Sequence, residues 1–358
     1  MREPQYISHE NLRRALDAMI ARYAVFAPQR AERSIEFLPL ESGSAVIRLA
    51  YPSSKWAPKR FLFPQCESLL KCNFAAQGRD RLSPVEIPTD RPVLLYGVRP
   101  CDAHSFAILD HVFLKQAGVV DPYYATRREN TTVIAIACDQ PASTCFCVSL
   151  EGGPHDSQGA DALLREVEES GESGESSAGY LVEILTEKGA RAFEGLALEA
   201  ASAGQIAQAG RRKAAAEATA RIDVQPRDLT AALGDIFESD VWDRIHDKCL
   251  GCGTCTFLCP TCHCFDIQDE RAGADGRRLR NWDSCMFPLF TLHASGHNPR
   301  GSQRERWRQR AMHKFNYYPT KFGPIACVGC GRCVKDCPTG IDIRRILKTL
   351  ETAAARAE

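Results

Sequence analysis

The sequence predicts an α+β protein, in which an N-terminal α/β-type domain precedes an α-helical domain that carries two cysteine runs. Two short apolar runs with an amphipathic segment between them predict the first domain. Two similar cysteine runs, which open at Cys249 and Cys327 and have helix-like segments between and after them, predict the second. We therefore divide the chain into an N-terminal domain (1–150), a segment that completes it (151–235) and a C-terminal helical domain (236–358).

The first elements are a helix and a pair of strands. Apolar residues recur on one helical face between positions 12 and 23, and Ser8 before them can act as an N-cap. The strand-like runs 34–40 and 45–50 are separated by a short turn-like sequence that contains glycine, which predicts a hairpin.

Two buried strands should follow. The runs 92–98 and 131–139 are short and continuously apolar, as expected for strands of a sheet that is covered on both faces. The amphipathic segment 103–116 lies between them and predicts a helix.

The middle of the chain changes composition. Residues 151–178 are rich in glycine, serine and glutamate, and we expect at least 166–178 to form a mobile surface loop. The run 180–186 predicts a strand that returns to the sheet, followed by alanine-rich helical sequence. A further helix is expected after Pro226, leading into the first cysteine run.

Both cysteine runs follow the pattern C-x2-C-x2-C-x3-C-P, the ligand spacing of a bacterial-type ferredoxin with two clusters. In this pattern the first three cysteines of a run hold one cluster, and the cysteine before proline reaches the other. Zinc has no use for that fourth cysteine, and disulfides are disfavoured in a reducing compartment. The predicted ligands of the first [4Fe–4S] cluster are Cys249, Cys252, Cys255 and Cys337. Those of the second are Cys327, Cys330, Cys333 and Cys259.

A second, weaker set of cysteines follows the two apolar strands. If these strands are parallel neighbours, the thiols meet at one sheet edge, where ligand sites of α/β folds form. They would then suit a third [4Fe–4S] cluster, with Asp102 or Asp139 as a substitute oxygen ligand. The alternatives are cysteines that pack as small apolar side chains, a zinc site or a redox switch. This N-terminal cysteine set is Cys101, Cys138, Cys145 and Cys147.

The other cysteines carry weaker signals. Cys262, Cys264 and Cys285 are expected to pack around the clusters and to donate weak S–H hydrogen bonds to cluster sulfides. Cys66 and Cys72 have no spacing typical of a metal site.

The last third of the chain also contains helix-like and histidine-containing segments. The segments 303–315 and 341–357 suit helices. Alternating arginines in the first of these should spread over several faces of a solvated helix, and docking to an acidic partner is the alternative. His293 and His297 are expected in a loop, because Gly296 disfavours a helix there.

Composition excludes several classes of protein. Lys+Arg and Asp+Glu are both 45, so nothing in the net charge suggests binding to nucleic acid or an anionic membrane. The N-terminus lacks a secretory signal and no apolar run is long enough to span a bilayer. Seventeen cysteines in such a chain indicate metal or redox chemistry in a reducing, cytoplasmic location. No GxGxxG or P-loop fingerprint of a nucleotide site occurs.

Five motifs together carry a family resemblance that covers the chain from about residue 34. They are YGVRPCDAHSF, ACDQPASTCFC, LGCGTCTFLCPTCHCFDI, NWDSCMFPLFTLHASGHNPRG and ACVGCGRCVKDCPTGIDI. In this combination the chain resembles the β, iron–sulfur subunit of cytoplasmic NADP-linked nickel–iron hydrogenases of the sulfhydrogenase type. It is similar also to the anaerobic sulfite reductase subunit that has the same layout of motifs.

The resemblance implies an electron-transfer subunit that carries two [4Fe–4S] clusters and is not catalytic alone. Its implied partners are a flavin/NAD(P)-binding γ subunit and the small and large hydrogenase subunits, or a sulfite reductase catalytic subunit. Two alternatives from other classes are a self-contained iron–sulfur enzyme and a redox sensor. The sensor would need a DNA-binding or effector module, and we see no helix-turn-helix or basic domain.

Overall fold

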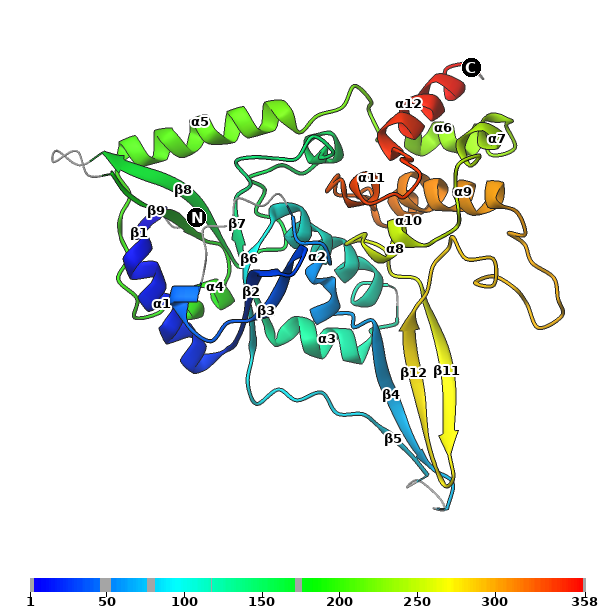
Figure 1. Ribbon diagram of the computed structural model, residues 1–358, viewed down its shortest axis with the longest axis horizontal. Coiled ribbons are helices and arrows are strands. Elements are labelled where there is room, and N and C mark those ends of the chain that lie inside the picture. The colour runs from blue at the N-terminus through cyan, green and yellow to red at the C-terminus, as the bar shows by residue number, and fades with distance from the viewer. Residues whose placement is uncertain (1–2, 46–52, 76–80, 117, 171–175, 357–358) are drawn as a thin grey trace.

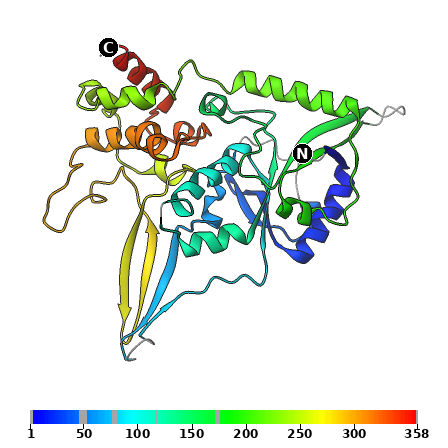
Figure 2. The same ribbon diagram turned by 180° about the vertical axis from the view of Figure 1, so that it is seen from behind.

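The computed structural model describes residues 3–45, 53–75, 81–116, 118–170 and 176–356. An N-terminal sheet domain and a C-terminal group of helices lie side by side, and a narrow β arm projects from their junction (Figure 1 and Figure 2). The α+β class predicted from the sequence is therefore confirmed. Within the described residues, no helix is both long and apolar enough to cross a membrane.

The N-terminal domain is built on an eight-stranded mixed sheet of order β10-β1-β9-β8-β7-β6-β2-β3. Its strands are β1 (Gln5–Ser8), β2 (Ala24–Ala31), β3 (Ser34–Pro39), β6 (Val93–Val98), β7 (Thr131–Ile136), β8 (Ala162–Ser170), β9 (Ser176–Ile184) and β10 (Glu199–Ala200). Strands β2, β6, β7 and β8 are parallel neighbours, and the outer pairs are antiparallel. The predicted parallel pairing of the two apolar runs is therefore present.

Helices cover both faces of this sheet. They are α1 (His9–Arg22), α2 (Pro100–Phe113), α3 (Pro122–Glu129), α4 (Glu187–Ala192) and α5 (Ala203–Thr219). Because successive strand residues face opposite sides, Leu94 packs in the core with α1 and α4, whereas Leu95 packs in the core with α2 and α3. Ser8 caps α1 by accepting a hydrogen bond from the Asn11 backbone N, as its sequence predicts.

The C-terminal helices surround the two cysteine runs. They are α6 (Leu229–Asp235), α7 (Val241–Ile245), α8 (Thr254–Phe257), α9 (Gln303–Met312), α10 (Tyr318–Phe322), α11 (Arg332–Lys335) and α12 (Ile343–Ala354). A π-helical turn, His313–Tyr317, joins α9 to α10. The core between these helices includes Trp242, Trp307 and Leu347, and it also takes in Phe146 and Leu150 from the N-terminal part of the chain.

The projecting arm is a four-stranded antiparallel sheet of order β11-β12-β4-β5 (Figure 1). Its strands are β4 (Cys66–Asn73), β5 (Leu82–Pro84), β11 (Phe265–Ala272) and β12 (Asp275–Trp282). The hairpin of β11 and β12 leaves the helical part directly after the first cysteine run, and β4 pairs with β12 to join the two halves of the chain.

Strand β3 pairs with β2, and residues 46–50 of its predicted hairpin partner lie outside the described residues. Two other expectations need correction. Much of the expected loop 166–178 is strand, because β8 and β9 pair as far as Ser170 and Ser176. The sequence between the cysteine runs holds a hairpin as well as helix α9, and only the helix was expected.

Candidate iron–sulfur centres

The two cysteine runs fold into loops of the same backbone shape. In each run, the glycines on either side of the second cysteine adopt left-handed φ angles, +66° and +73° at Gly251 and Gly253 and +60° and +74° at Gly329 and Gly331. Gly253 and Gly331 then serve as the N-caps of the short helices α8 and α11. Each cysteine run therefore forms a tight loop before its short helix.

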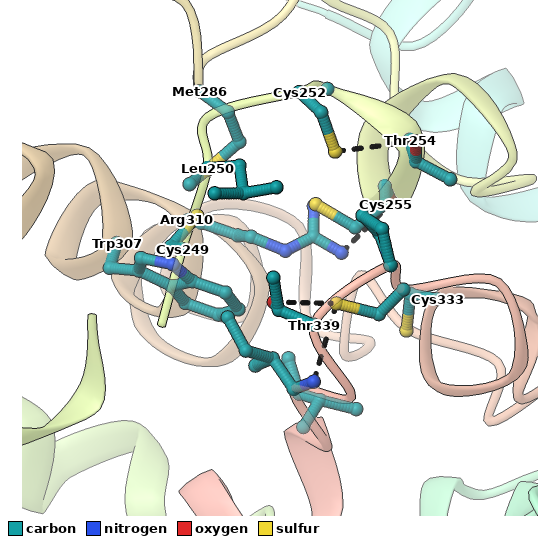
Figure 3. A pocket seen from close by; sticks show the side chains of 15 residues that line it. Cys249, Leu250, Cys252, Thr254, Cys255, Met286, Trp307, Arg310, Cys333 and Thr339 are labelled. Atoms are coloured by element: carbon teal, nitrogen blue, oxygen red, sulfur yellow. Dashed lines mark hydrogen bonds between the residues drawn. The ribbon is translucent and has the colours of Figure 1, made fainter. Parts of the chain in front are cut away.

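The first loop lines a small cavity. The four cysteines predicted for the first cluster all line it, and so does Cys333. Figure 3 shows the first three cysteines of the first run, Trp307 and Arg310 around this space. Cys337 thus faces the cavity of the first run although it belongs to the second.

The second loop lines another small cavity. Cys327, Cys330 and Cys333 line it together with Cys259, which comes from the first run. The lining of each cavity thus includes one of the two predicted ligand sets, and the ligation itself stays a prediction. Cys333 lines both cavities, so the two lie next to each other.

Hydrogen bonds to sulfur surround the first cavity. The Gln303 side-chain Nε2 donates to Cys249 Sγ at 3.0 Å, and the backbone N of Gly251 donates to the same sulfur at 3.4 Å. The backbone N of Ile341 donates to Cys337 Sγ at 3.3 Å. Donors of this kind stabilise thiolates and tune cluster potential.

Two buried cations from one helical face stand between the cavities. Arg310 and Lys314 are only 2% and 4% exposed, and both line the second cavity. Lys314 Nζ donates to Cys259 Sγ at 3.4 Å, and Arg310 also lines the first cavity. Burial alone would lower the pKa of Lys314, but the neighbouring thiols, Cys259 first among them, raise it.

Burial and the nearby positive charges also shift the pKa values of the motif cysteines. Burial raises the pKa of Cys330 to about 12, and it also raises the pKa of Cys255 and Cys327. A hydrogen bond from Cys262 and the positive charges of Lys314 and Arg310 hold the pKa of Cys259 well below its usual range. Burial thus favours the neutral thiol at Cys255, Cys327 and Cys330, and a bound metal ion would favour the thiolate there.

The cavity walls fit iron–sulfur clusters. Trp307 Nε1 and Arg310 Nε are buried donors without a hydrogen-bond partner among the described residues. Trp307 lines the first cavity and Arg310 lines both. Unsatisfied buried donors are costly, and sulfide or thiolate acceptors in the cavities would satisfy them.

The N-terminal cysteine set lies against the second loop. Phe146 N donates to Gly329 O at 2.8 Å, and a Cβ on Gly329 would come within 2.5 Å of the Cys147 backbone N. Cys145 Sγ donates to Cys330 O at 3.7 Å. The segment 144–147 therefore packs directly on the backbone of the second cysteine run.

Within this set, Cys147 lies near the other three thiols. Burial first, and then the nearby thiols of Cys145 and Cys138, raise the pKa of Cys147 to about 12. Cys101 lies close to Cys147 and also to Cys330, and its pKa is raised by burial and by Asp102.

The two carboxylates suggested as substitute ligands are engaged elsewhere. Asp102 pairs with Arg332. Asp139 accepts hydrogen bonds from His155 at 2.8 Å and from Arg212 at 3.0 Å. Both side chains already have strong partners, which disfavours a ligand role.

The arginines of α9 do not form a solvated face. Arg306 and Arg310 are buried, and Arg308 lies over the Phe237 ring at 3.9 Å from its centroid. One feature of the sequence could have indicated that Arg310 and Lys314 are buried. They share the helical spacing of the apolar residues Trp307, Ala311 and Phe315. His293 and His297 lie in a loop, as expected.

Comparisons with known proteins agree with this geometry. A family model described as a 4Fe-4S dicluster domain matches residues 248–341. The chain is 32% identical over 331 residues to sulfhydrogenase 2 subunit beta of Pyrococcus furiosus, a match that covers 90% of this chain and 91% of that protein. No solved structure gives a significant match. The chain belongs to the family of sulfhydrogenase beta subunits.

Proposed function

We propose that this chain relays electrons from a flavin/NAD(P)-binding subunit to a nickel–iron hydrogenase module, or in the reverse direction. The observation that carries the proposal is the pair of adjacent cysteine-lined cavities, which share Cys333 and Arg310. A [4Fe–4S] cluster supplies one-electron transfer, and two neighbouring clusters make a path through the protein.

In this proposal the ligands are crossed between the two runs. Cys337 completes the first site and Cys259 completes the second. The chain's own contribution is to hold the thiolates, to exclude water by burial and to set potentials through Arg310, Lys314 and the donors at Cys249. No side chain of the chain is assigned an acid, base or nucleophile role.

A third [4Fe–4S] cluster at Cys101, Cys138, Cys145 and Cys147 stays part of the proposal. Its support is the proximity of Cys138, Cys145 and Cys147 and their packing on the second cysteine run. A centre there would extend the electron path into the N-terminal domain.

Co-purification from the native host tests the proposal. A tagged chain should bring down both a flavoprotein and a nickel protein, and the complex should reduce NAD(P)+ with H2. Sirohaem without nickel in the complex would instead assign the chain to an anaerobic sulfite reductase. Isolation without any redox partner would contradict both assignments.

A further inference from the structure

A third, small cysteine-lined cavity lies beside the two motif cavities. Three cysteines outside the two motifs line it, and we call them the hairpin-base cysteines: Cys262, Cys264 and Cys285. His313 lines the same cavity, as do Arg310 and Lys314. The ring of His263 stands edge-on to that of His313, with 5.2 Å between the ring centroids.

The β arm brings these cysteines together. Cys264 directly precedes β11, and Cys285 comes soon after β12. The backbone N of Asp283 donates to Cys264 O at 3.0 Å and closes the base of the hairpin. The Cys264 and Cys285 thiols are hydrogen-bonded to each other, and the Cys262 thiol is hydrogen-bonded to Cys259.

Buried positive charge surrounds this cavity. Lys59, Arg310 and Lys314 are 2%, 2% and 4% exposed. Within the described part of the chain, their hydrogen-bond acceptors are sulfur, hydroxyl and carbonyl oxygen atoms and include no carboxylate. Burying a charge is costly unless an opposite charge lies nearby.

Lys59 lies beside the hairpin base, although it lines none of the three cavities. Its Nζ donates to Cys262 O at 2.7 Å and lies 4.2 Å from the centroid of the Trp282 ring. The thiols nearest to its charge are those of Cys262, Cys259 and Cys264. Anionic ligands at the hairpin base would therefore balance this ammonium group.

We propose that the hairpin-base cysteines hold an additional [4Fe–4S] cluster, with His313 as the fourth ligand. Thiolates and a neutral imidazole are suitable ligands for iron. The site shares Arg310 and Lys314 with the second motif cavity, so the additional centre is a neighbour of the cluster proposed there. The assignment of metal to this cavity does not depend on the partners proposed above.

Single serine substitutions in the anaerobically purified full-length chain test the assignment. Cys262→Ser, Cys264→Ser and Cys285→Ser should each lower the iron content by about four atoms per chain and leave the paired signals of the two motif clusters in place. Cys66→Ser, at an exposed cysteine of the same arm, is the matched control and should keep all iron. Full iron in all three variants would overturn the proposal, as would zinc in place of iron.

Two measurements on the wild type do not depend on whether the variants fold. Iodoacetamide should label Cys262 and Cys264 only after iron is chelated, and should label exposed Cys66 in both states. Labelling of Cys262 and Cys264 in the iron-loaded protein, or a Cys264–Cys285 disulfide in its mass spectrum, would overturn the proposal.

A nitrogen hyperfine coupling that disappears in His313→Gln should identify the fourth ligand, and its absence from the wild type would rule out His313. Absence of the two motif clusters from the wild-type protein would instead contradict the proposed electron-transfer function.

Discussion

Arg332 and Asp102 form a buried, two-pronged ion pair that joins the second cysteine run to the N-terminal domain. Nη1 and Nη2 of Arg332 donate to the two carboxylate oxygens of Asp102 at 2.6 and 2.7 Å, and each side chain is only 1% exposed. Arg332 begins α11 between Cys330 and Cys333, and Asp102 stands beside Cys101 in the first turn of α2. The pair therefore fixes the second cysteine loop against the carboxyl end of β6.

Removing the carboxylate should leave a buried, unpaired guanidinium. We expect Asp102→Asn to lower the free energy of unfolding by about 3–5 kcal/mol, the usual cost of breaking a buried pair from one side. Chemical denaturation of the iron-loaded protein measures this. Asp269→Asn is the control. It removes the partner of Arg278 on the exposed arm and should leave the denaturation midpoint unchanged. Equal effects of the two substitutions would contradict the account.

The crossed ligand sets make a second prediction. Cys259→Ser should perturb the cluster held mainly by the second run, and Cys337→Ser should perturb the cluster held mainly by the first. Electron paramagnetic resonance of the reduced variants separates the two signals. If each substitution disturbed only the cluster of its own run, the crossed assignment would be wrong.

Lys314 should tune one cluster more than the other. Its ammonium group lies 3.4 Å from Cys259 Sγ and lines the second cavity but not the first. Because a nearby positive charge favours the more negative reduced state, Lys314→Met should lower the reduction potential of the second cluster. A redox titration followed by electron paramagnetic resonance measures the shift. Lys321→Met, at an exposed position of α10, is the control and should leave both potentials unchanged. A larger shift at the first cluster would contradict this role.

The N-terminal cysteine set yields a fourth prediction. Cys145→Ser or Cys147→Ser should lower iron content by about four atoms per chain, because a lost thiolate destabilises an assembled cluster. Cys72→Ser on the arm should leave iron unchanged. Variants that keep full iron and an unaltered spectrum would show that the set consists of packing residues.

Much of this arrangement could be predicted from the sequence. Local signals were sufficient for α1, where Ser8 caps an amphipathic run, and for the buried parallel strands β6 and β7. The spacing of the eight motif cysteines predicted their crosswise grouping, because that pattern constrains the loop geometry tightly.

The remaining features depend on tertiary contacts. Strand β11 alternates apolar and polar residues only over 265–268 and is exposed throughout, so its local signal is weak and pairing with β12 defines it. Arg310 was expected on a solvated helix because charged side chains seldom enter a core without partners, and Lys314 was not singled out, yet both are buried. Their partners are thiols from distant segments, which a reading of local sequence does not bring together.

Metal analysis of the anaerobically purified chain tests the central claim most directly. Two clusters in the crossed sites require at least about eight iron and eight acid-labile sulfide per chain, and more if the N-terminal or hairpin-base cysteines also hold iron. The reduced protein should show two interacting [4Fe–4S]+ centres by electron paramagnetic resonance. Protein that contains zinc and no labile sulfide would contradict the account.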